Sequence, residues 1–186
     1  MVGLTHTFRL GDAQARRALS GLGDAGLALG YRLDDAQAQR ALAGLVEAGT
    51  DMTELMDDIG AAMVTSTQLR FEDGEAPDGS KWTPSIRARE EGGKTLVDSS
   101  HLMDSITHSA SATQVEWGTN VLYAAVHQLG KTIKPKTQPY LRFKIGDRWS
   151  LKKQVTIPAR PFVGLSDEDK DVIRERVTGY LREAVR

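Results

Sequence analysis

Histidines are the side chains of this chain best suited to chemistry, because an imidazole can bind a metal or move a proton near neutral pH. No two of them stand in an HxH or HExxH pattern, so their spacing does not predict a zinc site. The sequence lacks cysteine, which excludes disulfides, thiol nucleophiles and thiolate ligands. It also lacks the GxxxxGK(S/T) pattern of a phosphate-binding loop. The four histidines are His6, His101, His108 and His127.

One short cluster contains the residue types of a hydrolase triad. Ser99 and Ser100 precede His101, and Asp104 follows within one helical turn. The GxSxG turn that often presents a nucleophilic serine is absent. Serine at such a place is typical of a helix N-terminus, and we interpret the cluster as a helix cap. A hydrolase that uses His101 or His127 is the least favoured of three functional hypotheses, and the other two are given below.

His127 lies in a short apolar stretch, YAAVHQLG, at residues 123–130. A histidine there can be a ligand, a catalytic base or a packing residue. We interpret the stretch as a structural corner, in which His127 and Gln128 satisfy backbone groups and Gly130 lets the chain turn outward. Its apolar members are expected to pack on the sheet or on the long helix: Tyr123, Ala124 and Val126.

Basic side chains are concentrated in one segment of the chain. Residues 131–153 carry eight Lys or Arg against the single acid Asp147, whereas residues 1–80 carry 13 acids and six bases. This asymmetry favours head-to-tail packing of copies, or a basic face that meets an acidic partner. The alternative is two independently solvated faces.

The same basic segment has the pattern of a projecting β-hairpin. Residues 140–145 (YLRFKI) alternate apolar and polar side chains, Gly146-Asp147 begins a turn, and residues 150–157 (SLKKQVTI) return as the partner strand. Three roles are open: contact with nucleic-acid phosphates, docking on an acidic face of a neighbouring copy or another protein, or plain solvation. We favour docking, because a long hairpin offers strand edges and flat area. The candidate residues for a protein interface or for contact with DNA are Lys134, Lys136, Arg142, Lys144, Arg148, Trp149, Lys152, Lys153 and Arg160.

The segment after the hairpin is expected to be a stiff, extended corner. Pro158 and Pro161 bar a helix there, and Arg160 between them is held in a fixed direction. An earlier turn is predicted at Pro77-Asp78-Gly79, whose residue types each favour a turn. Trp82 just after it is expected to anchor the loop to the core.

Two helices are predicted to hold the core. The first covers residues 51–69, with Asp51 and Glu54 at capping-box spacing. The second starts at Ser166 and has acids in its first turn. The expected buried faces are Leu55, Ile59, Ala62, Met63 and Leu69 in the first helix, and Val172, Ile173, Val177, Tyr180 and Leu181 in the second.

The N-terminal part contains an internal repeat. Residues 9–22 and 32–45 are identical at 11 of 14 positions. Each copy has the pattern of a short strand followed by a helix, and two copies are too few for a solenoid. One copy is expected to pack in the core, and the other is a candidate arm on a neighbouring subunit.

These patterns predict one α+β domain. An antiparallel sheet takes strands around 27–33, 105–109, 114–118, 140–145 and 150–157, the 51–69 helix packs across it, and the C-terminal helix lies beside it or at an interface. No apolar run approaches the roughly 18 residues of a membrane span. We also expect no signal peptide, because no basic region is followed by an apolar one near the N-terminus.

The motifs in their order resemble the phage virion morphogenesis family, which includes tail-completion proteins of Mu-like and related tailed phages. They are PDGSKW, a short helix before two strands, YAAVHQLG, IKPK with a basic hairpin at 131–157, and IPARPFVGLS with a final helix. The resemblance covers about residues 30–186. Residues 1–29 go beyond the family pattern and form a duplicated strand–helix extension.

The resemblance implies a virion structural protein that completes the tail or neck and joins it to the DNA-filled head. It implies no catalysis, cofactor, metal, membrane or small-molecule substrate. The implied partners are copies of the chain in a ring of six or twelve, neck or connector proteins, tail terminator or tail tube proteins, and the DNA in the exit channel. The implied location is the head–tail junction, after assembly in the host bacterial cytoplasm. A DNA-binding module that uses the basic hairpin is the second hypothesis.

Overall fold

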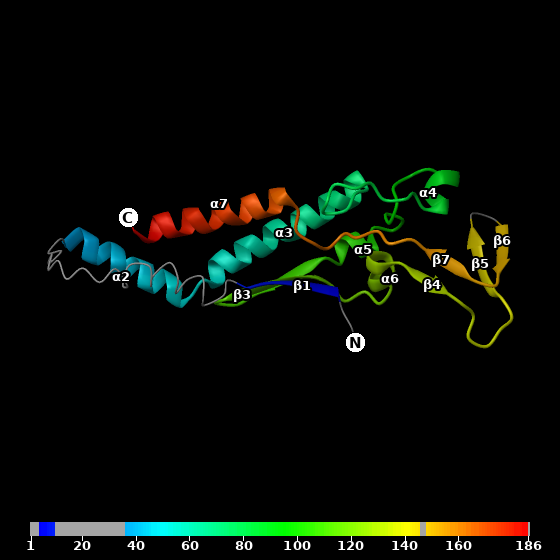
Figure 1. Ribbon diagram of the computed structural model, residues 1–186, viewed down its shortest axis with the longest axis horizontal. Coiled ribbons are helices and arrows are strands. Elements are labelled where there is room, and N and C mark those ends of the chain that lie inside the picture. The colour runs from blue at the N-terminus through cyan, green and yellow to red at the C-terminus, as the bar shows by residue number, and fades with distance from the viewer. Residues whose placement is uncertain (1–3, 10–35, 146–147, 186) are drawn as a thin grey trace, which may run out of the picture.

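The computed structural model describes residues 4–9, 36–145 and 148–185, which form an elongated α+β structure (Figure 1). Helix α7 (Asp167–Ala184), helix α3 (Thr53–Asp73) and a three-stranded sheet are stacked as successive layers, with α3 in the middle. A β-ribbon leaves one end of these layers, and helix α2 (Ala36–Thr50) extends from the other. The predicted fold class is therefore confirmed.

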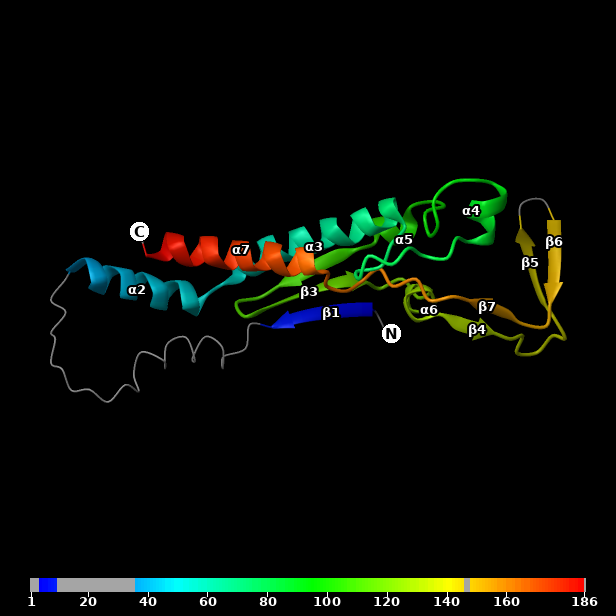
Figure 2. The same ribbon diagram turned by 45° about the horizontal axis from the view of Figure 1, so that its top comes forward.

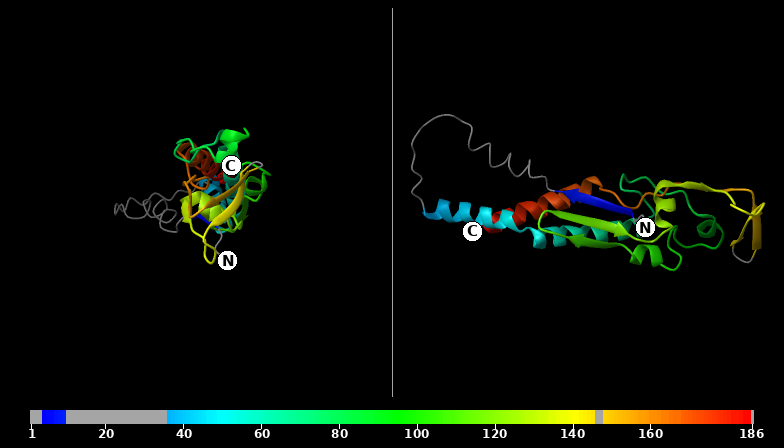
Figure 3. Two further views of the ribbon diagram at one scale, coloured as in Figure 1. Left: turned by 90° about the vertical axis from the view of Figure 1, so that its right-hand side faces the viewer. Right: turned by 90° about the horizontal axis from the view of Figure 1, so that it is seen from below.

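The sheet is antiparallel and has the order β1-β3-β2. Strands β2 (Thr107–Ala110) and β3 (Gln114–Thr119) lie close to two of the predicted strands and form a hairpin, and Val115 and Trp117 of β3 are buried in the core. Strand β1 (Leu4–Arg9) pairs along the other edge of β3, with Leu4 opposite Thr119. Figure 3 shows the sheet covering one side of α3.

Two strands assigned to this sheet from the sequence lie elsewhere. Segments 140–145 and 150–157 pair with neither β2 nor β3, so that part of the prediction is wrong. Alternation of apolar and polar residues shows that a strand has two faces, but it does not select the pairing partner. The strand predicted at 27–33 lies outside the described residues, and the third position in the sheet belongs to β1.

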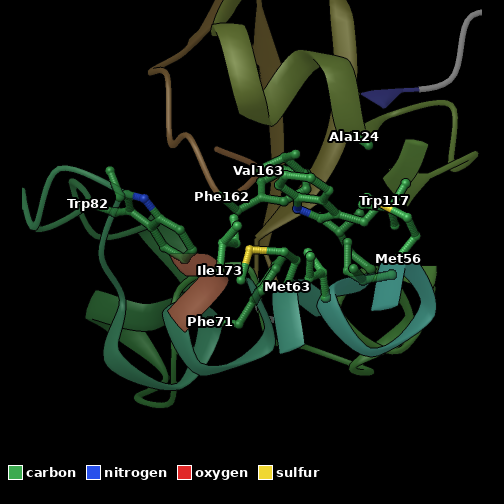
Figure 4. Close-up of a cluster of buried hydrophobic side chains, with 14 of the residues drawn as sticks. Met56, Met63, Phe71, Trp82, Trp117, Ala124, Phe162, Val163 and Ile173 are labelled. Atoms are coloured by element: carbon green, nitrogen blue, oxygen red, sulfur yellow. The ribbon is translucent and has the colours of Figure 1, made fainter. Parts of the chain in front are cut away.

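Helix α3 supplies much of the core (Figure 4). Its buried apolar side chains are Leu55, Met56, Ile59, Met63 and Phe71. The close approach of α3 to the sheet requires Gly60, because a Cβ there would lie 2.3 Å from the His108 ring. The predicted core role of Leu55, Ile59 and Met63 is confirmed.

Both ends of α3 differ from the prediction. Asp51 accepts hydrogen bonds from the Thr53 backbone N–H (2.9 Å) and hydroxyl (2.5 Å), and no side-chain capping bond forms at Met52. The helix also runs one turn further, to a left-handed Gly74. Leu69 is exposed, which corrects its predicted burial, because the last turns direct Arg70 and Phe71 inward instead.

Ser166 caps α7 in a capping box with Asp169. Ile173 is buried, and Val177 and Tyr180 pack against the core as predicted. The predicted burial of Val172 and Leu181 is wrong, since both side chains are substantially exposed. The helix is rotated so that Asp169, which has a charged partner on α3, lies on the inner face.

That partner is Arg70, and the two residues form an ion pair buried between α3 and α7. Arg70 also donates to the carbonyl oxygens of Phe162 (2.9 Å) and Gly164 (3.0 Å). Ser66 donates its hydroxyl hydrogen to Asp169. Sequence patterns did not predict this pair, which joins two helices to the segment after the ribbon.

The described parts of the internal repeat come one from each copy. β1 ends at Arg9, the first residue of the first copy, and α2 begins within the second copy. α2 packs on the C-terminal end of α7, where a Cβ at Gly44 would lie 2.0 Å from the carbonyl oxygen of Ala184. The Tyr180 hydroxyl donates to the carbonyl of Ala48 (3.0 Å), which ties the end of α2 to α7.

The predicted hairpin at 131–157 consists of two ladders in succession (Figure 2). At the base, β4 (Lys131–Ile133) pairs with β7 (Val155–Ile157). At the tip, β5 (Leu141–Ile145) pairs with β6 (Arg148–Lys152). The predicted strand 150–157 is thus divided between the two ladders.

In the described part of the chain, three short helices lie in the connections: α4 (Ile86–Glu90), α5 (His101–Asp104) and α6 (Ala124–Leu129). Ser85 caps α4, because its Oγ accepts from the Ala88 N–H (3.1 Å). Ser100 precedes α5 with a φ of 58° and makes no side-chain capping bond, so the cap predicted there is wrong.

Candidate assembly surface

The base of the ribbon is fixed by the corner that the YAAVHQLG stretch forms. Gly130 has a φ of 71°, and a Cβ there would lie 2.7 Å from the Ala159 nitrogen, so glycine is required as predicted. The Gln128 side chain accepts from the N–H groups of Phe162 (2.9 Å) and Val163 (3.1 Å) and donates to the Val163 carbonyl (2.8 Å). The prediction that Gln128 satisfies backbone groups is confirmed.

Tyr123 and His127 differ from their predicted roles. Tyr123 is 44% exposed and faces the His127 ring edge-on at 6.0 Å, whereas its neighbour Ala124 is fully buried. Because α6 is a helix, successive residues point about 100° apart and cannot share the inner face. The backbone carbonyl of His127 accepts a hydrogen bond from the backbone N–H of Arg160 (2.7 Å). The buried Nδ1 of the His127 ring has no hydrogen-bond partner among the described residues.

The predicted turn and anchor on the opposite side of this corner are confirmed. Gly79 has a φ of 78°, and Asp78 accepts from the Ser80 N–H (2.9 Å). Trp82 is buried, and its Nε1–H donates to the Pro161 carbonyl (2.9 Å). Its ring meets Phe71 edge-on at 5.6 Å, so the turn is tied both to α3 and to the proline corner.

The β5–β6 tip mixes cations and apolar residues on both of its faces. Directly opposite residues in an antiparallel ladder share a face, and three cations of this ladder are each opposite an apolar residue. The pairs are Arg142 with Leu151 and Lys144 with Trp149 on one face, and Lys152 with Leu141 on the other. The tip is therefore a mixed surface and not a continuous basic stripe.

One face of the tip exposes large apolar groups beside charge. Trp149 and Leu151 are each 62% exposed, and the Arg142 guanidinium stacks 4.4 Å from the centre of the Trp149 ring. Tryptophan and arginine are enriched among residues that dominate protein–protein binding. We call the face formed by Arg142, Lys144, Trp149 and Leu151 the tip face.

The structure divides the predicted interface residues into two groups. Lys134, Lys136 and Lys153 are exposed along the ribbon, together with the cations of the tip. Arg160 is only 5% exposed and lies at the base of the ribbon, beside His127. Leu151 was not among the predicted residues, because its place opposite Arg142 depends on the register of the ladder.

The serine and histidine cluster has no triad geometry in the described residues. The side chains of Ser99, Ser100 and His101 do not hydrogen-bond to one another. Among all the described residues, no group of three His, Asp or Glu side chains is arranged to hold a metal ion. None of the described helices is long and apolar enough to cross a membrane.

The profile of the phage virion morphogenesis family matches residues 33–182. The chain belongs to this family. The matched region begins before α2, includes the whole ribbon and ends within the last turn of α7, whereas β1 lies outside it. Family membership gives the protein a structural role in phage assembly and associates it with the virion.

Two phage proteins are similar to most of this family member. "Mu-like prophage FluMu G protein 2" of Haemophilus influenzae is 31% identical over 124 residues, which are 67% of this chain and 74% of the relative. "Putative capsid assembly protein G" of Escherichia phage Mu is 32% identical over 136 residues, 66% of this chain and 78% of the relative. No solved structure matches the chain significantly.

Proposed function

We propose that this protein completes the tail or neck of a tailed phage and joins it to the DNA-filled head, as a ring of copies around the DNA exit channel. Family membership supports the assembly role. The observation that carries the more specific proposal is the projecting tip face, with Arg142 stacked on an exposed Trp149. The role requires no catalysis and no cofactor.

The composition of the tip face favours docking on protein. Exposed Trp149 and Leu151 would leave apolar area in water unless a partner covers them. Cations beside them give such a contact its register through charge complementarity. The expected partners are a neighbouring copy in a ring of six or twelve, neck or connector proteins, and tail terminator or tail tube proteins.

The distribution of charge along the molecule is compatible with a head-to-tail ring. The tip lies at one end of the elongated structure, far from the first turns of α3 (Figure 1). Those turns carry Glu54, Asp57 and Asp58, which are all exposed. A contact between unlike surfaces of identical subunits generates a ring when the rotation between neighbours closes.

A phage that carries a stop codon early in this gene tests the junction role. We expect lysates to contain DNA-filled heads and separate tails by electron microscopy, and finished particles when the protein is supplied from a plasmid. Normal particles without the protein, or heads that never fill with DNA, would overturn the junction role and leave the family assignment intact.

A DNA-binding module is the second candidate, and the stacking of Arg142 on Trp149 is the observation that favours it, because aromatic rings with cations bind single strands. This function predicts binding that weakens steeply with salt. The slope of log affinity against log salt should fall by about one for each phosphate contact removed. Unchanged binding to single-stranded and duplex DNA after Lys152→Glu with Lys153→Glu would count against it.

A further inference from the structure

Arg160 is a buried cation at the base of the ribbon, 5% exposed and fixed between Pro158 and Pro161. Its Nε donates to the carbonyl of Thr83 (2.7 Å). Within the described residues, no carboxylate oxygen lies within 4.0 Å of the guanidinium, and its two terminal nitrogens make no hydrogen bond to the protein. Most of its donor capacity is therefore unused.

Comparison with Arg70 shows that Arg160 lacks a counter-ion. Arg70 is equally buried, but it has Asp169 as a counter-ion and two backbone carbonyls as acceptors. The two terminal nitrogens of Arg160 are not among the fully buried side-chain atoms that lack a partner, so they meet solvent inside the adjoining pocket. The charge has thus lost much of its hydration without gaining a protein counter-ion, which is unfavourable. The surroundings of Arg160 are thus suited to an anion that the described residues do not supply.

Arg160 lines a pocket of about 330 Å³ between α5, α6 and the loop before α5. Hydroxyl groups and imidazoles line the same pocket: Ser99, Ser100, Tyr123, His101 and His127. A second cation on its wall, Arg87, is already engaged with the carbonyls of Lys94 (2.8 Å) and Val97 (2.6 Å) and with the carboxylate of Asp98 (3.5 Å). Arg160 is the cation that remains available to an occupant.

Backbone strain is concentrated on this pocket. Leu96 (φ 65°) and Ser100 (φ 58°) are the two non-glycine residues with positive φ in the described chain, and both line it. Side chains with a Cβ rarely adopt this conformation, and strained residues cluster at ligand sites. The loop that closes one side of the pocket is therefore held in a costly shape beside an unpaired cation.

We propose that this pocket binds a carboxylate, the side chain of an Asp or Glu of a partner polypeptide in the assembled virion. A single guanidinium matches the two oxygens of one carboxylate through paired hydrogen bonds. Asp98 at the rim disfavours an ion with a second negative charge. This site goes beyond the proposed docking of the tip face and does not depend on it.

A neutral His127 leaves Arg160 as the positive charge beside it in the pocket, which suits an anion with a single negative charge. Burial, and secondarily the charge of Arg160, lower the pKa of His127 below its ordinary value of 6.5. The imidazole therefore adds no second positive charge at neutral pH, and it can serve as a hydrogen-bond donor or acceptor to the bound group.

Capped amino acids test the site directly on the full-length protein. N-acetyl-aspartate amide and N-acetyl-glutamate amide are titrated at constant ionic strength while the Arg160 Nε–H and His127 ring signals are followed by NMR. We expect saturable shifts with both probes and none with N-acetyl-glutamine amide, the neutral match of the second probe. Arg160→Gln should weaken binding about tenfold or more, because a charge-assisted pair is lost, whereas Arg182→Gln at an exposed position on α7 should not change it.

Three outcomes would overturn the proposal. The first is equal shifts with the acidic probes and with N-acetyl-glutamine amide, or none with either. The second is tighter binding of inorganic phosphate than of either carboxylate, which would point to nucleic acid. The third is undiminished binding to Arg160→Gln. If Arg160→Gln does not fold, the titrations of the unmodified protein still decide.

Discussion

Replacement of Arg70 or Asp169 should lower the stability strongly, because each is buried and each compensates the charge of the other. Replacing Arg70 by Leu leaves the Asp169 carboxylate buried without a cation. We expect a loss of about 3–5 kcal/mol in the free energy of unfolding, measured by urea denaturation.

The matched control is Arg174→Leu on α7, the helix that carries Asp169, where the ion pair of Arg174 with Asp171 is exposed. An exposed pair contributes about 0–1 kcal/mol, so this variant should unfold close to the parent. Equal losses in the free energy of unfolding for Arg70→Leu and Arg174→Leu would show that the buried pair contributes no more to stability than the exposed one.

His127 gives a residue-scale prediction about pH. Burial and the nearby Arg160 lower its pKa in the folded protein below 6.5, so the unfolded chain binds a proton more readily than the folded one does. Stability should therefore fall as pH decreases through 6.5 toward the lowered folded pKa, and it should be fully retained above 6.5.

Thermal unfolding of the parent and of His127→Gln at pH 7.5 and 5.5 measures this effect. Glutamine does not titrate, so the variant should lose less stability between the two pH values than the parent does. Identical losses would mean that the His127 imidazole has the same pKa in both states.

At the scale of elements, glycine decides where helices can touch. Gly44 lets α2 lie against the end of α7, because a Cβ there would meet the Ala184 carbonyl at 2.0 Å. Gly49 in the same helix has open space around its Cβ position. Gly49→Ala should leave stability unchanged or raise it by up to about 1 kcal/mol, whereas Gly44→Ala should lower it.

Amide hydrogen exchange shows which helix is destabilised by each glycine substitution. In Gly44→Ala, the α2 amides should lose protection, while the α3 amides keep theirs because α3 has its own contacts with the sheet and α7. Similar protection of α2 in both variants would contradict the close packing of α2 on α7.

At the scale of the whole molecule, the tip face should control assembly without contributing to the fold. It projects from the far end of the ribbon and lies outside the core (Figure 3). Arg142→Glu with Lys144→Glu should therefore abolish the ring measured by native mass spectrometry and leave the unfolding temperature close to that of the parent.

Arg89→Glu with Arg182→Glu is the control for that experiment, since it makes the same change of charge at exposed positions on α4 and α7. This control should still assemble. Loss of the ring in both double variants would indicate a general effect of charge, and assembly of the tip variant would remove the tip from the interface.

The sequence by itself determined the local elements and their order. Hydrophobic periodicity located α3, α7, β2 and β3, because the spacing of apolar residues follows the geometry of helix and strand directly. Glycine and proline chemistry located the turn at 77–79 and the corner at Gly130, because those backbone shapes admit few residue types. The ordered motifs were enough to indicate the family.

Only the tertiary structure decided how those elements are combined. Strand pairing separated the ribbon from the main sheet and placed β1 beside β3, since backbone hydrogen bonds carry no side-chain label of their partner. Packing also rotated α7 so that Asp169 meets Arg70, and it enclosed Arg160 beside His127. These are contacts between residues far apart in the chain, and local residue patterns do not encode which distant charges are paired.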